Sequence, residues 1–273
     1  MLRSMYSGVA GMKGFQTKLD VIGNNIANVN TVGFKKSRVM FQDILSQTTK
    51  GVTAPVADTS GGVNAQQVGL GSRVSSIDTL HLAGSAQTTN NPTDLRIDGD
   101  GFFAVKLSAD QEVPYLTRAG DFHVDSARQL VTSDGGLVVD TGGTPITIPD
   151  TAVSFSIQAN GTILLTNADG TTENGAQLGI AKVVNPEGLE KIGGSLYRVT
   201  PNAVTDGDLG DLVAAGDAEA GTGSIVAGQL EMSNVDLTDE FTEMIVAQRG
   251  FQANSRIITT SDDILQELIN LKR

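Results

Sequence analysis

The chain has 273 residues, no Cys, no Trp, 32 Gly and only 4% aromatic residues, and its formal net charge is −12. This charge argues against a nucleic-acid-binding protein, because such a protein needs basic surface to replace the counterions of the phosphates. It argues equally against binding to an anionic membrane surface. The lack of Cys excludes disulfides, thiolate catalysis and cysteine-ligated metals.

Charge is unevenly spread along the chain. Residues 1–45 carry six Lys/Arg and two Asp/Glu, whereas residues 231–273 carry four and eight. The opposite net charges of the two ends favour an interaction between them, although chance surface composition explains these charges equally well. The first 30 residues have no apolar segment followed by a small-residue cleavage site, so we expect no cleaved signal peptide. The chain contains no run of about 18 apolar residues, so we expect no transmembrane helix.

The first segment of the chain has the apolar spacing of a helix, with steps of three and four residues. A breaker-rich stretch at residues 28–33 (NVNTVG) predicts where this helix ends. The apolar positions are Leu2, Met5, Val9, Met12, Phe15, Leu19, Ile22, Ile26 and Val29.

The last segment repeats this pattern with alternating steps of four and three, which is typical of a heptad seam. Polar residues at 248, 255 and 262 interrupt the seam, and Asp236 is the expected N-cap of the helix. The apolar members of the seam are Leu237, Phe241, Met244, Phe251, Ile258, Leu265 and Ile269. An amphipathic helix must bury such a face, either against the other end of its own chain or against other chains.

The middle of the chain predicts an antiparallel sheet or small barrel. Asp-Gly and Asn-Gly pairs separate short alternating runs, as they do in β-hairpins. We expect strands at residues 102–107, 137–139, 146–148, 155–157 and 163–165. Two stretches rich in Gly, Ser, Thr, Asp and Ala, residues 46–66 and 200–223, predict loops or extended linkers.

The sequence contains no recognisable catalytic, cofactor-binding or metal-binding constellation, so we predict neither an enzyme nor a cofactor. His81 and His123 have no acidic partner at a motif spacing, and we expect them to be solvent-facing or hydrogen-bonded structural residues. The acidic run at residues 94–101 fails as an EF-hand loop, because Arg96 and Val105 occupy positions that need ligands. A turn is the better interpretation of that run.

Several longer motifs resemble those of the flagellar rod and hook proteins. At the ends of the chain these are LDVIGNNIAN (19–28), TVGFK (31–35), SNVDL (233–237), MIVAQR (244–249) and ILQELINL (264–271). In the middle they are DLRIDGDGFF (94–103), YLTRAGDF (115–122) and GLEKIG (188–193). The motifs appear in the order of that family and span nearly the whole chain.

The resemblance implies an α+β fold in which long N- and C-terminal helices form a coiled-coil-like inner domain around a channel, with a central all-β domain outside it. The expected domains are the terminal helical domain (1–30 and 235–273), an extended linker region (31–70 and 224–234) and the β-rich outer domain (71–223). Both apolar stripes would then form the assembly interface.

The resemblance also implies partners and a location. Expected partners are further copies of the chain in a helical homopolymer, the rod, hook-cap and hook–filament junction proteins, and the flagellar export apparatus. No nucleic acid and no membrane insertion are expected. The expected location is extracellular, in the flagellar hook or basal body, after export without a cleaved signal peptide.

Within the family, the motifs at 21–26, 233–237 and 244–249 favour a hook subunit, a flexible joint that transmits torque from rod to filament. The start MLRSMY and the segment 46–66, which resembles an extra stretch of distal rod proteins, favour a distal rod subunit instead. Two other classes stay open: a secreted β-domain binding module, which would be a monomer with a defined ligand, and an enzyme with a cleft of perturbed carboxylates.

Overall fold

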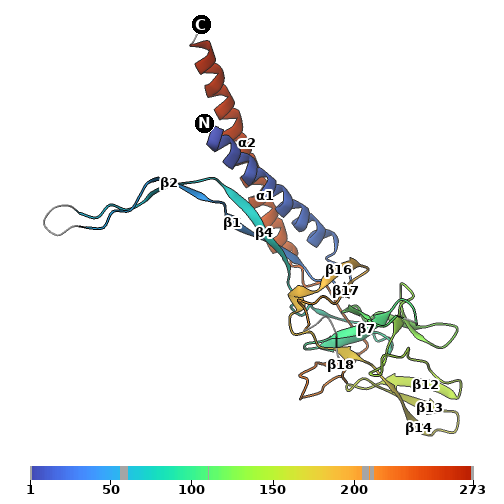
Figure 1. Cartoon of the computed structure of the whole chain (residues 1–273). Helices are drawn as coiled ribbons and strands as arrows, with labels where there is room; N and C mark the ends of the chain where they lie inside the picture. The colour runs from blue at the N-terminus through green and yellow to red at the C-terminus, as the bar shows by residue number, and fades with distance from the viewer. Residues whose placement is uncertain (1, 56–60, 110, 205–208, 210–211, 272–273) are drawn as a thin grey trace. The chain divides into compact units, whose positions relative to one another are not determined.

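The computed structural model describes residues 2–55, 61–109, 111–204, 209 and 212–271 (Figure 1). The chain divides into two compact units. We call Met1–Ala27, Ser37–Thr79 and Asp236–Arg273 the helical unit, and Asn28–Lys36 and Leu80–Val235 the β-rich unit. An N-terminal helix, many β-strands and a C-terminal helix confirm the predicted α+β class.

Two helices dominate the helical unit, α1 (Leu2–Ala27) and α2 (Leu237–Asn270). The Asp236 side chain accepts hydrogen bonds from the backbone N–H groups of Thr238 (2.8 Å) and Asp239 (3.4 Å), which confirms the predicted N-cap. The α1 helix ends where a turn begins at Asn28, as the breaker-rich stretch predicts. Neither helix has a stretch long and apolar enough to span a membrane, within the described residues.

Two antiparallel strand pairs complete the helical unit. The first joins β1 (Ser37–Asp43) to β4 (Ser72–Thr79), and the second joins β2 (Ser46–Lys50) to β3 (Gln66–Gly69). The prediction of irregular structure at residues 46–66 is therefore wrong at both ends of that segment. Every side chain of β2 and β3 is exposed, so these strands lack the apolar alternation by which a strand is recognised in a sequence. Part of the predicted linker range 31–70 thus forms strands β1 to β3.

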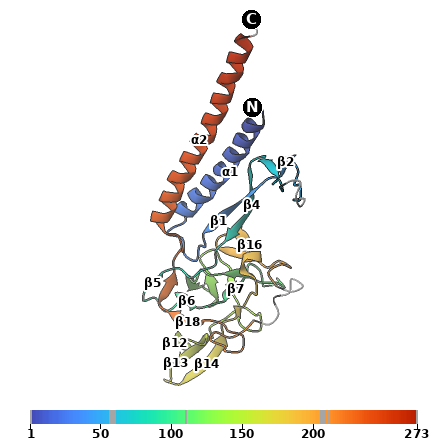
Figure 2. The same ribbon diagram turned by 90° about the vertical axis from the view of Figure 1, so that its left-hand side faces the viewer.

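The β-rich unit is built around one large antiparallel sheet, ordered β16-β17-β8-β7-β11-β10-β9, with β15 pairing β7. A three-stranded sheet, β12-β13-β14, and two strand pairs, β18-β6 and β19-β5, accompany it (Figures 1 and 2). The strands of the large sheet are β7 (Phe102–Lys106), β8 (Tyr115–Thr117), β9 (Phe122–Val124), β10 (Leu130–Thr132), β11 (Leu137–Val138), β15 (Ile180–Ala181), β16 (Glu190–Gly193) and β17 (Leu196–Arg198). The remaining elements are β5 (Ala86–Thr88), β6 (Leu95–Asp98), β12 (Ala152–Ile157), β13 (Thr162–Asn167), β14 (Thr172–Gln177), the 3-10 turn η1 (Pro186–Gly188), β18 (Ser224–Ala227) and β19 (Gln229–Glu231).

Most of the predicted strand runs form strands, but residues 146–148 do not. Thr147 forms an isolated bridge to Gln129, and neighbouring Pro145 forms another to Val139. Proline cannot donate to a ladder, and Pro145 and Pro149 flank the run, so the pairing stops after single bridges. The turn prediction is confirmed at Gly161 and Gly170, which adopt φ of +81° and +75° between β12, β13 and β14.

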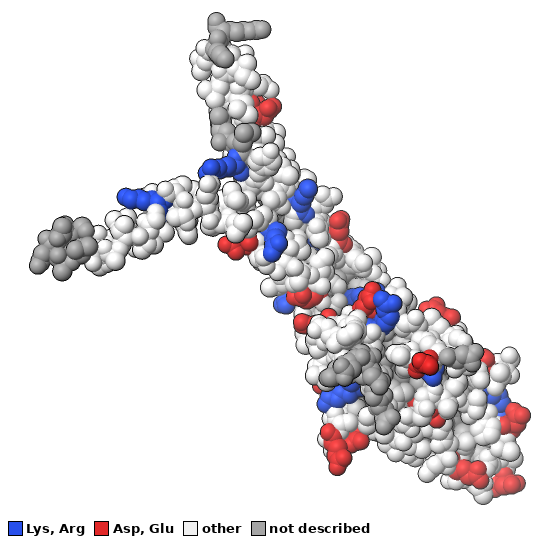
Figure 3. All heavy atoms as spheres, in the orientation of Figure 1, with Lys and Arg blue, Asp and Glu red and all other residues white. Residues whose placement is uncertain are grey.

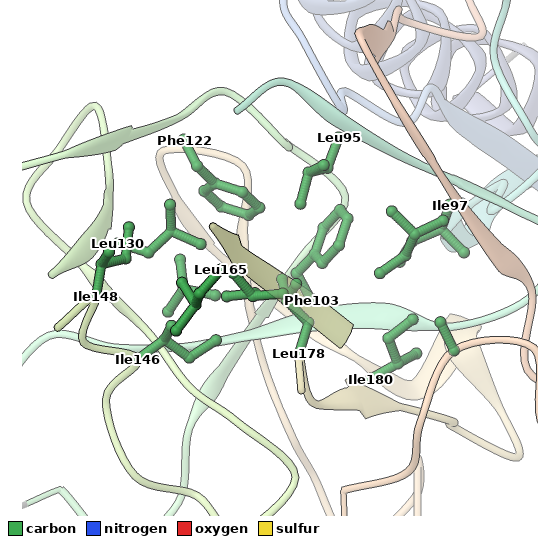
Figure 4. Packing of buried hydrophobic residues seen from close by; sticks show 14 of the residues in the cluster. Leu95, Ile97, Phe103, Phe122, Leu130, Ile146, Ile148, Leu165, Leu178 and Ile180 are labelled. Atoms are coloured by element: carbon green, nitrogen blue, oxygen red, sulfur yellow. The ribbon is translucent and has the colours of Figure 1, made fainter. Parts of the chain in front are cut away.

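The main hydrophobic core of the β-rich unit lies on one face of the large sheet (Figure 4). Phe103 and Phe122 meet edge to face, with ring centroids 5.1 Å apart, and both are almost fully buried. Ile225 of β18 joins this core, as does Leu165 of β13. A second cluster includes Phe102, Leu116, Leu189 and Tyr197.

Candidate assembly surface

The two terminal helices pack against each other in opposite directions within the helical unit (Figures 1 and 2). Near the end of α1, the amide nitrogen of Asn25 donates to Oε2 of Glu240 at 3.2 Å. Nearer the middle of the helix, Nζ of Lys18 lies 2.5 Å from Oε2 of Glu243. Both views show that α2 extends past the first turn of α1.

Glycines bring the elements of the helical unit into close contact. A Cβ atom added at Gly250 would lie 2.6 Å from the ring of Phe15, and one added at Gly14 would lie 2.7 Å from the ring of Phe41. The two phenylalanine rings are 5.8 Å apart, so Phe15 of α1 fills the space between α2 and β1. A larger residue at Gly250 would displace this ring.

The line of α2 that faces α1 has a seven-residue spacing and consists of small or polar residues. Glu240, Ala247 and Ser261 are buried, and Asn254, which completes the spacing, is partly buried. A Cβ atom added at Gly11 of α1 would lie 3.0 Å from the Asn254 side chain. The backbones of the two helices therefore approach closely at this point.

The structure buries most of the predicted N-terminal stripe. Ile22 is buried, and the partly buried members of the helix are Met5, Met12, Phe15, Leu19 and Ile26. Val9 is exposed, and the side chain of Leu2 lies outside the described residues. Val29 lies beyond the end of α1, in a turn that belongs to the β-rich unit.

The predicted C-terminal stripe divides into two sets. Met244, Ile258 and Leu265 are partly buried, whereas the exposed members are Leu237, Phe241, Phe251 and Ile269. Ile258 of this stripe lies close to α1, since a Cβ atom added at Gly8 would lie 3.5 Å from its Cγ1 atom. The assignment of these stripes to an assembly interface stays a prediction.

A further apolar line on α2 escaped the sequence reasoning. Its members follow a 7-4-7-4 spacing, which places them on one side of the helix next to the face that meets α1. Val246, Ile257, Ile264 and Leu268 are between 43% and 58% exposed, and Ala253 between them is exposed as well. We call these five residues the free line of α2.

The hairpin formed by β2 and β3 also exposes apolar side chains. Leu45, Val52 and Val68 are exposed around its strands, and no side chain of either strand is buried. Isolated two-stranded hairpins are marginal in water, because they bury too little surface to offset their conformational entropy. The hairpin is therefore a second exposed surface of the helical unit.

The surface of the β-rich unit carries mainly acidic groups on the face seen in Figure 3, with wide areas that bear no charge. This agrees with the sequence, in which residues 46–230 carry nine Lys/Arg against twenty-one Asp/Glu. Among the described residues, no group of three or more His, Cys, Asp and Glu is placed to hold a metal ion. The acidic run at residues 94–101 forms a strand and a turn, with Gly99 and Gly101 at φ of +123° and +132°.

The two histidines differ in their surroundings. His123 is exposed, in line with the prediction. The prediction is wrong for His81: both of its ring nitrogens are buried, without a hydrogen-bond partner among the described residues. Its ring contacts Phe102 and Tyr197 edge-on, with centroids 5.6 and 5.3 Å away. Burial, assisted by nearby Lys35, Lys191 and Arg118, lowers the pKa of His81 from 6.5 to about 4.

A buried ion cluster close to His81 was also missed. The Glu231 carboxylate lies between Lys35 (2.6 Å) and Arg118 (3.3 Å), and all three side chains are 5% exposed or less. Burial of charges is unusual unless they are paired, so this cluster is a structural feature of the β-rich unit. Lys35 and Arg118 lie within the motifs TVGFK and YLTRAGDF, which resemble those of the rod and hook family, and this was the only sequence signal for the cluster.

Comparison with known proteins gives a consistent class. Three family models match the chain: "Flagella basal body rod protein" at residues 5–35, "Flagellar hook protein FlgE/F/G D1 domain" at residues 96–165 and "Flagellar basal body rod FlgEFG protein C-terminal" at residues 226–271. The matched segments include both helices and much of the large sheet.

Full-length relatives carry the same names. The chain is 56% identical over 273 residues to the flagellar basal-body rod protein FlgG of Bacillus subtilis, and 36% identical over 273 residues to that of Borreliella burgdorferi; each alignment covers 100% of both proteins. It is 28% identical over 451 aligned residues to the flagellar hook protein FlgE of Borreliella burgdorferi, again covering 100% of both.

The chain therefore belongs to the FlgE/F/G family of flagellar rod and hook proteins, and it is a structural component of the bacterial flagellum and its basal body. Members of this family are structural proteins and not enzymes. The comparisons correct one expectation: the relatives that are 56% and 36% identical are rod proteins, whereas the hook relative is 28% identical, so the hook subunit favoured by the sequence motifs is the less supported assignment.

Proposed function

We propose that this protein is the distal rod subunit of the flagellar basal body, which polymerises with further copies of itself into a rigid drive shaft. One observation carries the proposal. The two rod relatives align with this chain over 273 residues, whereas the alignment with the hook relative of Borreliella burgdorferi extends over 451 residues. The chain thus has the length of a rod protein and lacks counterparts for a large part of that hook protein.

The free line of α2 supports self-assembly. One side of α2 already contacts α1, and the large apolar residues beside that side remain between 43% and 58% exposed. A second copy can cover them with its own helices, as the predicted coiled-coil-like inner tube requires. A repeated contact of this kind does not close on itself and so generates a helical array.

The β2–β3 hairpin supplies a second contact in this proposal. Its exposed strands would lie against neighbouring copies, which tie one subunit to the next outside the helices. Two separate contact regions on each subunit resist bending better than one, which suits a shaft. The proposed location is the basal body, reached by export without a cleaved signal peptide. The proposed neighbours are other rod proteins and the hook.

A flexible hook subunit is the second candidate. The observation that favours it is the 28% identity to a hook protein, together with the "hook protein FlgE/F/G D1 domain" match at residues 96–165. In that case the outer β-rich units would have to slide past one another during rotation.

The proposal is tested by placing a charge on the free line. Val246→Asp puts a carboxylate in a contact that we expect to become dry on assembly, so it should abolish polymerisation. Because Val246 is 58% exposed in the single chain, the variant should keep the unfolding temperature of the wild type to within a few degrees. Sedimentation and thermal unfolding measure the two properties.

Gln252→Asp is the matched control, since Gln252 is exposed on α2 and lies away from the free line. This variant should polymerise like the wild type. Polymers of Val246→Asp with normal yield would refute the role of the free line. A large loss of thermal stability would instead show that Val246 acts within the single chain.

A further inference from the structure

The Glu231 side chain joins segments of the β-rich unit that are far apart in the sequence. Oε1 accepts hydrogen bonds from Nζ of Lys35 (2.6 Å) and from the backbone N–H of Gly84 (3.0 Å). Oε2 accepts from Nη1 of Arg118 at 3.3 Å. The backbone carbonyl of Glu231 accepts from the N–H of Gly33 at 2.8 Å. One residue therefore holds strands and connections from both ends of the chain.

Further hydrogen bonds fasten the same segments. Nζ of Lys35 also donates to the carbonyl of Leu82 at 2.6 Å, and Nζ of Lys191 donates to the carbonyl of Lys35 at 2.7 Å. Asn234 accepts from the N–H of Lys36 and donates to the carbonyl of Leu80, both at 2.8 Å. Residues 28–36, 80–84 and 228–235 are thus fixed together, next to the points where the chain passes into the helical unit.

The charge balance of the cluster depends on Glu231 alone. Lys35 and Arg118 are both cationic and buried, and Glu231 is the one carboxylate that pairs with either of them among the described residues. Lys191, His81 and Tyr197 are the other titratable groups close by. Loss of the carboxylate charge would leave two buried cations facing each other, which is strongly destabilising.

The rest of the β-rich unit has its own source of stability. The main core, which includes Phe103, Phe122 and Leu178, contains none of the charged side chains of the cluster. Parts of a protein with separate contacts can open separately, each with its own free energy. The segments held by Glu231 can therefore open while the large sheet stays folded.

We propose that Glu231 is an acid-sensitive latch that fastens residues 28–36 and 228–235, the segments leading into the two helices, to the rest of the β-rich unit. When the carboxylate loses its charge, these segments detach and the large sheet remains intact. The latch acts within one chain, so it does not depend on the proposed rod function.

The direction of the pH effect follows from the surroundings of Glu231. Burial opposes ionisation, but the charges of Lys35 and Arg118 and the hydrogen bonds outweigh it and hold the pKa of Glu231 below its usual 4.5. A carboxyl with a lowered pKa stabilises the folded state fully above the unfolded pKa. That contribution is lost as the pH falls from about 4.5 through the folded pKa.

Glu231→Gln tests the latch, because it removes the charge and keeps an oxygen that can accept hydrogen bonds. Hydrogen exchange of the amides of Gly33 and Gly84 reports on the latch, and that of Ile146, which donates to Val138 within the core region, reports on the sheet. We expect the first two to exchange at least about 100-fold faster at neutral pH, which corresponds to about 2.8 kcal/mol. The Ile146 amide should be unchanged.

Glu190→Gln is the matched control, since Glu190 forms an exposed ion pair with Arg198 in the same unit. It should alter none of these exchange rates. Equal rates in Glu231→Gln and Glu190→Gln would overturn the proposal.

Acidification of the wild-type chain gives an independent test, which also serves if Glu231→Gln fails to fold. After correction for the intrinsic pH dependence of exchange, the Gly33 and Gly84 amides should lose protection below pH 4.5, at a higher pH than Ile146. Loss of protection at all three sites at one pH would contradict a separate latch, as would no loss at Gly33 and Gly84.

Discussion

At the scale of single residues, the buried ion cluster of the β-rich unit depends on long-range contacts that no local sequence pattern predicts. Lys35, Arg118 and Glu231 are far apart in the sequence, and nothing in their spacing predicts that they meet. Long-range pairing of β19 with β5, and the packing of residues 33–35 beside it, bring them together. By contrast, the Asp236 cap was predictable, because capping depends only on local geometry.

His81 offers a test of its buried site. Because its pKa falls from 6.5 to about 4 on folding, the unfolded chain takes up this proton first as the pH falls. The folded state therefore loses stability from about pH 6.5 down to about pH 4. His81→Phe keeps the ring contacts with Phe102 and Tyr197 and removes this proton. Its free energy of unfolding should vary less with pH over that range, as measured by urea unfolding.

His123→Gln is the control for the His81 experiment, since the side chain of His123 is exposed. It should keep the pH dependence of the wild type. An unchanged dependence in His81→Phe, matching that of His123→Gln, would show that His81 is not held uncharged in the folded protein.

At the scale of elements, the sequence predicts that the helices exist but does not reveal the small and polar residues on the face where they meet. Apolar spacing located α1 and α2 to within a few residues, because helix periodicity is a local property. The contact face of α2 consists of Ala247, Ser261 and polar residues, since glycines in α1 allow close approach. A search for large apolar residues cannot find such a face. The same search found no strand at β2 or β3, where neither face is buried.

The glycine contact predicts how sensitive the helix pair is to added volume. Gly250→Val should force the Phe15 ring away from α2 and lower the free energy of unfolding by about 2 kcal/mol. Circular dichroism at 222 nm during thermal unfolding measures this change, since α1 and α2 hold most of the helix. Gly23→Ala is the control, because an added Cβ meets nothing within 4 Å and should stabilise the helix by about 1 kcal/mol. Equal effects of the two changes would mean that the close contact contributes nothing.

At the scale of the whole molecule, the order helix, β-domain, helix follows from the sequence. Residues 37–79 join the helical unit, and residues 28–36 join the β-rich unit. The chain therefore passes between the units four times, and local signals mark two of these positions, the breakers that follow Ala27 and the N-cap Asp236. Family membership was recognisable from motifs, whereas the proposal of a rod subunit rests on the lengths over which the relatives align.

The most direct test of the proposed rod function is electron microscopy of the purified wild-type protein after polymerisation is induced. We predict straight, rigid tubes, because each subunit should contact its neighbours through both the free line of α2 and the β2–β3 hairpin. Curved or supercoiled tubes would contradict the rod assignment and favour a hook subunit. A protein that stays monomeric under all conditions would contradict self-assembly itself.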